Sequence, residues 1–268
     1  MNDLRIAVAI TRAAVGRVKD NLDRVRQWTK AAKSQGAALI CFPEMSVTGY
    51  FNHNEIRRVA EPVPGAISRN LLEIAVEENV VVLAGMAERS ASDNIYASHL
   101  VVNPDGNVGI YRKLHIAPPE KKYLTAGSDI PLFKISGYTF GIQLCYDAHF
   151  PELTTQMAVK GADVIFLPHA SPRGNSEDKF KSWMRHLPAR AFDNGLYIVA
   201  CNQTGENERG LSFPGIALVI NPSGDVLKKE INGDETIIIA DLKQDALEQV
   251  RHHDMRYFLP HRRPDIYG

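Results

Sequence analysis

One stretch, residues 138–152, constrains the fold more than any other; it reads YTFGIQLCYDAHFPE. Apolar residues alternate with smaller or polar ones from Phe140 to Leu144, which predicts a half-buried strand. The alternation stops at Cys145, and Pro151 suits the first turn of a following helix, where proline's missing N–H costs nothing. Because α/β proteins place reactive groups at the open ends of their strands, we expect a reactive thiol in an α/β fold.

The composition is that of an ordinary globular protein. The chain has 268 residues, 44% of them hydrophobic, and its 31 basic residues balance 31 acidic ones, so nothing indicates a nucleic-acid or anionic-membrane partner. The N-terminal MNDLRIAVAI predicts a first strand and not a signal peptide, and no apolar run is long enough to cross a membrane. Three cysteines without an export signal predict reduced thiols in the cytoplasm.

Strand and helix signals alternate along the chain without a linker, a repeat or a low-complexity tract. We therefore expect one α/β domain of sheets flanked by helices. The predicted strands cover residues 4–10, 37–42, 80–87, 95–102, 108–112, 138–144, 163–167, 196–201, 215–220, 225–229 and 235–241. The predicted helices cover residues 18–32, 66–79, 152–160, 178–194 and 243–253.

The remaining segments are predicted to be loops. Residues 45–65 carry several Gly and Pro residues and are expected to form a long surface loop. Residues 113–131 have no convincing period, and a connection of that length inside a compact domain is usually functional. The tail, which contains FLPHRRPDIYG, is expected to extend over a surface or onto a partner.

Two further strand ends carry charged residues. Glu44 follows ALICFP and Lys113 follows VGIYR, so a carboxylate, an ammonium and the Cys145 thiol would meet if these strands share an edge. A glutamate close to a cysteine can take its proton and later return it to a leaving amine. A lysine in a dry pocket can stabilise an oxyanion, helped by a backbone N–H. These groups suit acyl transfer through a thioester, and Glu120 is a second carboxylate that could hold the lysine or a substrate.

Taken together, these motifs resemble those of the nitrilase superfamily of carbon–nitrogen hydrolases. The matching segments are FPEMSVTGY around Glu44, YRKLHIAPPE around Lys113 and GIQLCYDAHFPE around Cys145, in the family's order. Further matches are GADVIFLP at 161–168, the NPSG turn and the closing RRPDIY. The resemblance covers essentially the full length.

The resemblance implies a four-layer α-β-β-α sandwich formed by a single domain over residues 1–268. It implies Glu44 as general base, Lys113 as oxyanion stabiliser and Cys145 as nucleophile. The backbone N–H of Tyr146 would complete the oxyanion hole, and Glu120 would position substrate and orient the lysine.

The resemblance also bears on assembly. It implies a homodimer, or a larger homo-oligomer, formed through helices near the active site. The C-terminal tail, residues 254–268, would cross that interface.

The residues after the cysteine bear on the substrate. Members that hydrolyse nitriles commonly have Trp-Glu there, whereas CYD followed by FPE resembles the amidase and carbamoylase side. Several branches that act on acid-bearing amides have an arginine four residues after the cysteine, where this chain has His149. Histidine cannot form arginine's planar fork, so a small neutral or weakly polar amide is the expected substrate. Tyr50 and His169 are further candidate substrate contacts, and Asp147 is expected only to cap the following helix.

Other functions stay open at this point. A true nitrilase or an N-carbamoyl amine amidohydrolase would use the same site, and a catalytically silent copy would serve as a binding or assembly module. A Cys–His thiol protease would need a histidine base, for which the candidates are His115, His149, His169 and His186. No HExxH, CxxC, phosphate-loop or GxGxxG pattern occurs, so we expect no metal and no cofactor.

Overall fold

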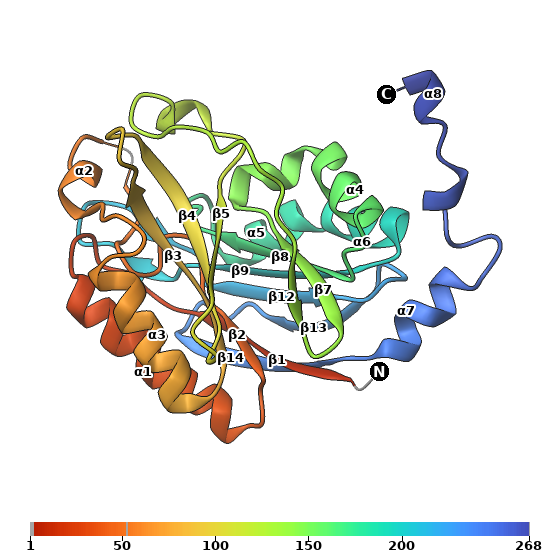
Figure 1. Cartoon of the computed structure of the whole chain (residues 1–268), viewed down its shortest axis with the longest axis horizontal. Coiled ribbons are helices and arrows are strands. Elements are labelled where there is room, and N and C mark those ends of the chain that lie inside the picture. The colour runs from red at the N-terminus through yellow and green to blue at the C-terminus, as the bar shows by residue number, and fades with distance from the viewer. Residues whose placement is uncertain (1–2, 52, 268) are drawn as a thin grey trace.

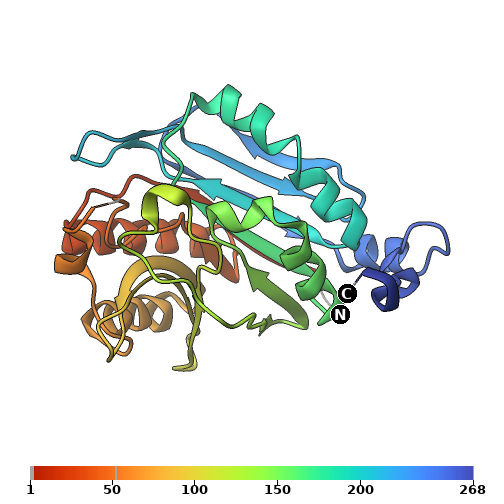
Figure 2. The same cartoon turned by 90° about the horizontal axis from the view of Figure 1, so that it is seen from above.

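The computed structural model describes residues 3–51 and 53–267. Residues 1, 2, 52 and 268, which belong to the predicted domain, the 45–65 loop and the tail, lie outside the described ranges. Two six-stranded sheets pack face to face, and helices cover their outer faces (Figures 1 and 2). This is the predicted four-layer α-β-β-α sandwich.

The first sheet has the order β14-β1-β2-β3-β4-β5. Its strands are β14 (Thr236–Leu242), β1 (Leu4–Ile10), β2 (Leu39–Cys41), β3 (Val81–Arg89), β4 (Ile95–Val102) and β5 (Val108–Arg112). Its outer face is covered by α1 (Val18–Ser34) and α3 (Ala66–Glu78), which pack on each other.

The second sheet has the order β13-β12-β9-β8-β7-β6. Its strands are β13 (Val226–Glu230), β12 (Ile216–Ile220), β9 (Tyr197–Asn202), β8 (Val164–His169), β7 (Tyr138–Ile142) and β6 (Phe133–Ile135). Its helices are α4 (Pro151–Val159), α5 (Ser176–Trp183) and α6 (Leu187–Asn194), of which α5 and α6 contact β12 and α4 packs on α6.

Short elements complete the described chain. They are α2 (Ile56–Val59), α7 (Gln244–Arg251), α8 (Pro264–Tyr267), the 3-10 turns η1 (Pro118–Glu120), η2 (Cys145–His149) and η3 (Leu259–His261), and the pair β10 (Gly205–Glu206) and β11 (Ser212–Phe213).

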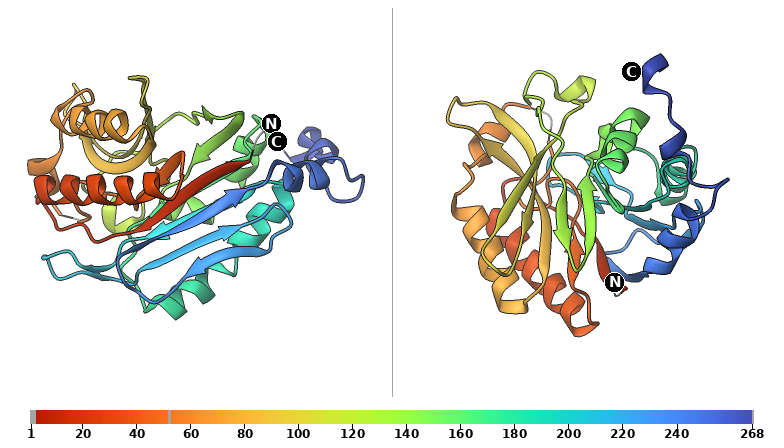
Figure 3. Two further views of the ribbon diagram at one scale, coloured as in Figure 1. Left: turned by 90° about the horizontal axis from the view of Figure 1, so that it is seen from below. Right: turned by 45° about the vertical axis from the view of Figure 1, so that its right-hand side comes forward.

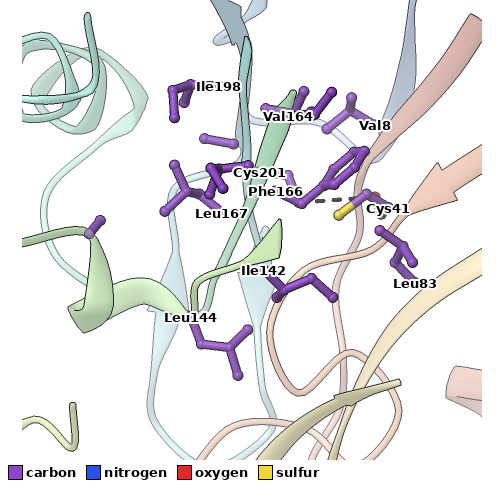
Figure 4. Close-up of a cluster of buried hydrophobic side chains, with 14 of the residues drawn as sticks. Val8, Cys41, Leu83, Ile142, Leu144, Val164, Phe166, Leu167, Ile198 and Cys201 are labelled. Atoms are coloured by element: carbon purple, nitrogen blue, oxygen red, sulfur yellow. Dashed lines mark hydrogen bonds between the residues drawn. The ribbon is translucent and has the colours of Figure 1, made fainter. Parts of the chain in front are cut away.

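The strand sequences explain the layering. In β1, the large Ile6 and Val8 face the inter-sheet core, whereas the small Ala7 and Ala9 face the core beneath the helices. Strand side chains point to opposite faces in turn, so one strand serves both cores, and alanine leaves room for a helix. Figure 4 shows the inter-sheet core, where residues such as Cys41 and Phe166 meet from the two sheets.

In each sheet, three adjacent strands run parallel. They are β1, β2 and β3 in the first sheet and β7, β8 and β9 in the second. Segments that leave the carboxyl ends of these strands lie outside the regular hydrogen-bond ladder, where they can carry a site. Glu44 follows β2, and Cys145 follows β7.

The expectation of a long surface loop over residues 45–65 is wrong for its first part. Met45, Val47 and Phe51 are at most 2% exposed. The segment can be buried because β3 satisfies its polar groups: the Val47 N–H donates to the carbonyl of Gly85 at 2.9 Å, and the Gly85 N–H donates to the Ser46 hydroxyl at 3.1 Å.

The predicted helix over residues 178–194 is in fact two helices, α5 and α6. Pro188 lies at the start of α6, and it has no N–H to donate to the turn before it. The helix therefore breaks after Trp183 and begins again at Leu187. The short strand β6 was not predicted; it pairs with β7.

The first part of the C-terminal tail contacts the body of the molecule: the ring of Phe258 lies 5.6 Å from that of Phe192 on α6, and Leu259 packs against the core. The end of the tail, with α8, projects away from the sheets, as Figures 1 and 3 show. Among the tail's described residues, Met255 is 79% exposed and Ile266 is 69% exposed. No helix within 3–51 and 53–267 combines the length and the apolar character needed to cross a membrane.

Candidate active site

A buried lysine lies between two carboxylates at the strand ends. The Lys113 Nζ is 2.8 Å from Glu44 Oε1 and 2.9 Å from Glu120 Oε2. The three residues are at most 3% exposed, although they come from the ends of β5 and β2 and from η1. Burial alone would lower the pKa of Lys113, but the two carboxylates outweigh it and hold that pKa well above its ordinary value. The sequence-predicted Glu44, Lys113 and Glu120 therefore meet.

Tyr50, another predicted residue, joins this cluster. Its hydroxyl donates to Glu120 Oε1 at 2.8 Å, and its side chain is 8% exposed. Tyr50 therefore contacts the carboxylate that holds Lys113, and it fixes the orientation of Glu120 in the dry interior.

Glu44 is held from several directions. Besides Lys113, its Oε2 accepts the Ala170 N–H at 3.0 Å, and its backbone carbonyl accepts the Gln203 side-chain amide at 2.7 Å. Burial raises the pKa of Glu44 to about 7; Lys113 opposes this rise and Glu120 adds to it. A carboxyl group with that pKa can take and return a proton near neutral pH.

Cys145 lies on a strained turn. Its φ of 44° is in the left-handed region, which residues other than glycine rarely adopt and which is common at functional sites. The residue is partly exposed. Burial and the nearby Glu44 raise the pKa of the thiol to about 12, against the opposing charges of Lys113 and Lys179. The resting group is therefore a thiol that needs a base, and Glu44 is a carboxylate close enough to influence it.

Asp147 was underestimated by the sequence analysis. It is fully buried and does not merely cap a helix: its Oδ2 accepts the Tyr111 hydroxyl at 2.7 Å and the Leu144 N–H at 2.9 Å. Its Oδ1 accepts the His115 N–H at 2.8 Å and lies 2.8 Å from the His115 Nδ1. Asp147 thus links the cysteine turn to the segment that carries Lys113. Only its place two residues after Cys145 could have indicated this.

The four histidines proposed as bases have other contacts. The His169 Nδ1 lies 2.7 Å from the carbonyl of Leu167, and its ring centroid is 4.8 Å from that of Trp183. The rings of His149 and His186 are 5.1 Å apart. Burial lowers the pKa of His169, His149 and His186, in the last case to about 4. In the part of the chain that the structure describes, no hydrogen bond joins any of the histidines to the Cys145 sulfur.

A second buried lysine, which the sequence analysis missed, lies on α5. Lys179 is 8% exposed, and its Nζ is 2.6 Å from the Ser171 hydroxyl. Its charge lowers the pKa of the Cys145 thiol. Nothing in the local sequence SEDKFKSW separates Lys179 from the exposed Lys181.

A surface cavity of about 540 Å³ adjoins the cysteine turn. Its lining comes from the segment after Lys113 and from η2 and the residue that follows it: Leu114, His115, Ile116, Pro118, Lys121, Leu124, Ala126, Tyr146 and Phe150. Tyr146, whose backbone N–H is the expected oxyanion donor, therefore lines this cavity, whereas His149 and Lys179 do not.

Comparison with known proteins agrees with this geometry. The family model described as "Carbon-nitrogen hydrolase" matches residues 5–252. A nitrilase from Pyrococcus abyssi is 32% identical over 92% of this chain and 92% of its own. An N-carbamoylputrescine amidase from Oryza sativa subsp. japonica is 28% identical over 98% of this chain and 93% of its own.

The fold agrees as well. The structure of an amidase from Nesterenkonia AN1, of the nitrilase superfamily, superposes with a TM-score of 0.85 at 24% identity, covering 98% of this chain and 95% of that one. The fold and the family match together identify this chain as an enzyme of the carbon–nitrogen hydrolase family, within the nitrilase superfamily.

Proposed function

We propose that this enzyme hydrolyses an amide through a thioester on Cys145. The observation that carries the proposal is the buried Lys113 between Glu44 and Glu120, next to a thiol whose pKa responds to Glu44 and Lys113. Such a site holds Glu44 as a base and Lys113 as an oxyanion stabiliser in place before substrate binds, and it excludes water, which would weaken their electrostatic interactions.

The reaction begins with proton transfer from the Cys145 thiol to the Glu44 carboxylate. The sulfur forms a bond to the amide carbonyl carbon, and the electron pair of the carbonyl moves to its oxygen. The Lys113 ammonium, together with the backbone N–H of Tyr146, stabilises this oxyanion. When the oxyanion collapses, the C–N bond breaks and the departing nitrogen takes the proton from Glu44.

Water completes the cycle. Glu44 takes a proton from water, whose oxygen attacks the thioester carbon to give a second oxyanion on the same donors. The collapse of this oxyanion breaks the C–S bond and releases the acid, and Glu44 returns its proton to the sulfur. Glu120 and Tyr50 hold Lys113 in place throughout.

A nitrile is the second candidate substrate, because relatives include a protein named nitrilase. Sulfur can add to a nitrile carbon with the same base, so the site geometry suits both. A mutant of the Nesterenkonia amidase, which shares the fold, carries the acetamide moiety of fluoroacetamide bonded to its active-site cysteine, so the cysteine of that amidase is a nucleophile, and this supports the same role for Cys145. A nitrilase would form the acid from a nitrile without releasing free amide.

The test is ammonia release from a panel of amides, N-carbamoyl amines and nitriles. We expect amide hydrolysis by the parent, loss of it in Cys145→Ala, and an acyl adduct on the parent in intact-mass spectrometry. Cys201→Ala, which removes a buried thiol from the inter-sheet core, is the matched control and should keep activity. Activity that survives Cys145→Ala would refute the nucleophile. Silence of the parent across the panel would favour the binding-module alternative.

We also propose that the enzyme is a cytoplasmic homodimer, with the tail at the interface. The exposed apolar side chains of Met255, Phe258 and Ile266 support an interface role for the tail, and the three free cysteines support a reducing compartment. Light scattering of the full chain and of a chain ending at residue 253 tests the assembly. A monomer in the full chain would refute it.

A further inference from the structure

Among the residues that the structure describes, Lys179 is a buried ammonium without a carboxylate partner. Its Nζ donates to the neutral Ser171 hydroxyl at 2.6 Å, and within the described ranges no Asp or Glu forms an ion pair with it. Burial lowers its pKa, and the neighbouring Arg173 adds to that effect. Placing a cation in such a site is costly unless an anion pairs with it, so the arrangement favours an anionic ligand.

The position of Lys179 connects it to the catalytic site. Its partner Ser171 follows Ala170, whose N–H donates to Glu44 Oε2 at 3.0 Å. The Ser171 backbone is itself fixed, because its N–H donates to the Asn202 side chain at 2.9 Å and its carbonyl accepts from the same side chain at 3.1 Å. One rigid segment after β8 therefore positions both the carboxylate of Glu44 and the ammonium of Lys179.

Further basic groups lie near Lys179. The charge of Lys179 acts on both Cys145 and His149, and the ring of His149 lies 5.1 Å from that of His186. The Arg190 Nε, whose charge acts on both histidines, is buried without a hydrogen-bond partner among the described residues.

The acidic side chains near this cluster do not neutralise Lys179. Glu152 and Asp193, both exposed, act on Arg190 from outside. The cluster of Lys179, His149, His186 and Arg190, called the basic cluster below, runs from the buried Lys179 to the exposed His149. Its positive charge comes from Lys179 and Arg190, because burial lowers the pKa of His149 and His186, which offer ring nitrogens as hydrogen-bonding groups.

We propose that this basic cluster binds a carboxylate on the acyl part of the substrate, with Lys179 as its central contact. The preferred substrates are then monoamides of short dicarboxylic acids, in place of the neutral amides that His149 alone predicts. We place the carboxylate on the acyl part because that part stays bonded to the Cys145 sulfur during the reaction, and the charge of Lys179 acts on that sulfur. This inference rests on the proposed amide hydrolysis.

The kinetic test compares the monoamides of succinic, glutaric and adipic acids with butyramide. In the parent, kcat/KM for the best monoamide should exceed that for butyramide. In Lys179→Met the ratio of the two should fall ~10- to 100-fold, the range expected for a lost hydrogen bond to a charged group. We compare this ratio of kcat/KM values because the substitution also changes the pKa of the Cys145 thiol. That change affects both substrates alike and cancels in the ratio. Lys179→Arg should restore part of the ratio.

The control is Lys181→Met on the same helix, since Lys181 is exposed and pairs with the exposed Glu177 at 3.5 Å. Its ratio should equal the parent's. A parent that prefers butyramide, or an unchanged ratio in a Lys179→Met variant whose thermal unfolding is cooperative, would overturn the proposal.

A binding test separates this inference from the reaction itself. In Cys145→Ala, which cannot turn over by the proposed route, calorimetric titration with glutarate should show binding that Lys179→Met in the same background weakens at least about tenfold. Equal binding with and without Lys179 would refute the subsite even if amides are hydrolysed. Lys179-dependent binding would uphold it even if the nucleophile assignment failed.

Discussion

Replacing Asp147 by asparagine should both destabilise the fold and slow catalysis. The carboxylate is fully buried, and its two oxygens accept from the Tyr111 hydroxyl, the Leu144 N–H and the His115 N–H. An asparagine offers one acceptor oxygen and one NH₂ group in the same shape. Whichever way the amide turns, its NH₂ faces the backbone N–H of Leu144 or of His115 and leaves that donor unpaired.

The magnitude follows from these contacts. A buried donor left unpaired costs about 1–3 kcal/mol, and the other bonds lose the strength that a charged acceptor gives them. We therefore expect the free energy of unfolding to fall by about 2–4 kcal/mol. Tyr111→Phe removes one donor and leaves Asp147 with the others, so it should cost only about 0.5–1.5 kcal/mol. Asp23→Asn, at an exposed position on α1, should cost less than about 0.5 kcal/mol.

Urea denaturation of the three variants gives these free energies, and kcat/KM for an amide reports on the site. Because Leu144 precedes the strained Cys145, loss of its contact to Asp147 should lower kcat/KM while the folded fraction stays near one. The order Asp147→Asn, Tyr111→Phe, Asp23→Asn in decreasing effect is the expected result. An Asp147→Asn variant with the parent's stability and activity would show that Asp147 does not hold the cysteine turn.

Three further changes follow from the same geometry. Lys113→Met removes the expected oxyanion stabiliser and should lower kcat by ~10²- to 10³-fold, so a parent-like kcat would contradict the oxyanion role. It also leaves two buried carboxylates without their cation, so urea denaturation should show a loss of stability of about 3–5 kcal/mol. Because the pKa of Glu44 is raised to about 7, kcat/KM should rise as the pH rises through about 7, and a pH-independent rate would exclude Glu44 as the base. The raised pKa of Glu44 stabilises the fold fully below pH 4.5, and this stabilisation is lost as the pH rises through about 7. Urea midpoints measured between these two pH values should therefore fall for the parent but not for Glu44→Gln. Tyr50→Phe removes the hydroxyl donor to Glu120 and should lower kcat/KM about tenfold, whereas an unchanged value would limit Tyr50 to packing.

The parts of this molecule that the sequence predicted depend on local patterns. Apolar residues that alternate or recur at helical spacing located most strands and helices, because side chains of a strand or helix return to the same face at a fixed interval along the chain. Glu44, Lys113 and Cys145 stood out because each ends an apolar strand. The buried segment 45–51 was predicted as surface because its glycine and polar residues are typical of loops, and its hydrogen bonds to β3 are not visible in the chain itself.

The prediction about substrate charge shows what a linear comparison leaves out. His149 was weighed alone because it occupies the place, four residues after the cysteine, where other branches have arginine. A carboxylate, however, responds to every charge within several ångströms, whatever its distance along the chain. Lys179 comes from a helix that begins more than thirty residues after Cys145, yet its charge acts on the Cys145 thiol, and its Nζ is held by Ser171 in the segment after β8. The charges that a bound substrate would meet therefore depend on tertiary packing as well as on the residue at position 149, and the proposed role of Lys179 sets that packing against the expectation of a neutral substrate.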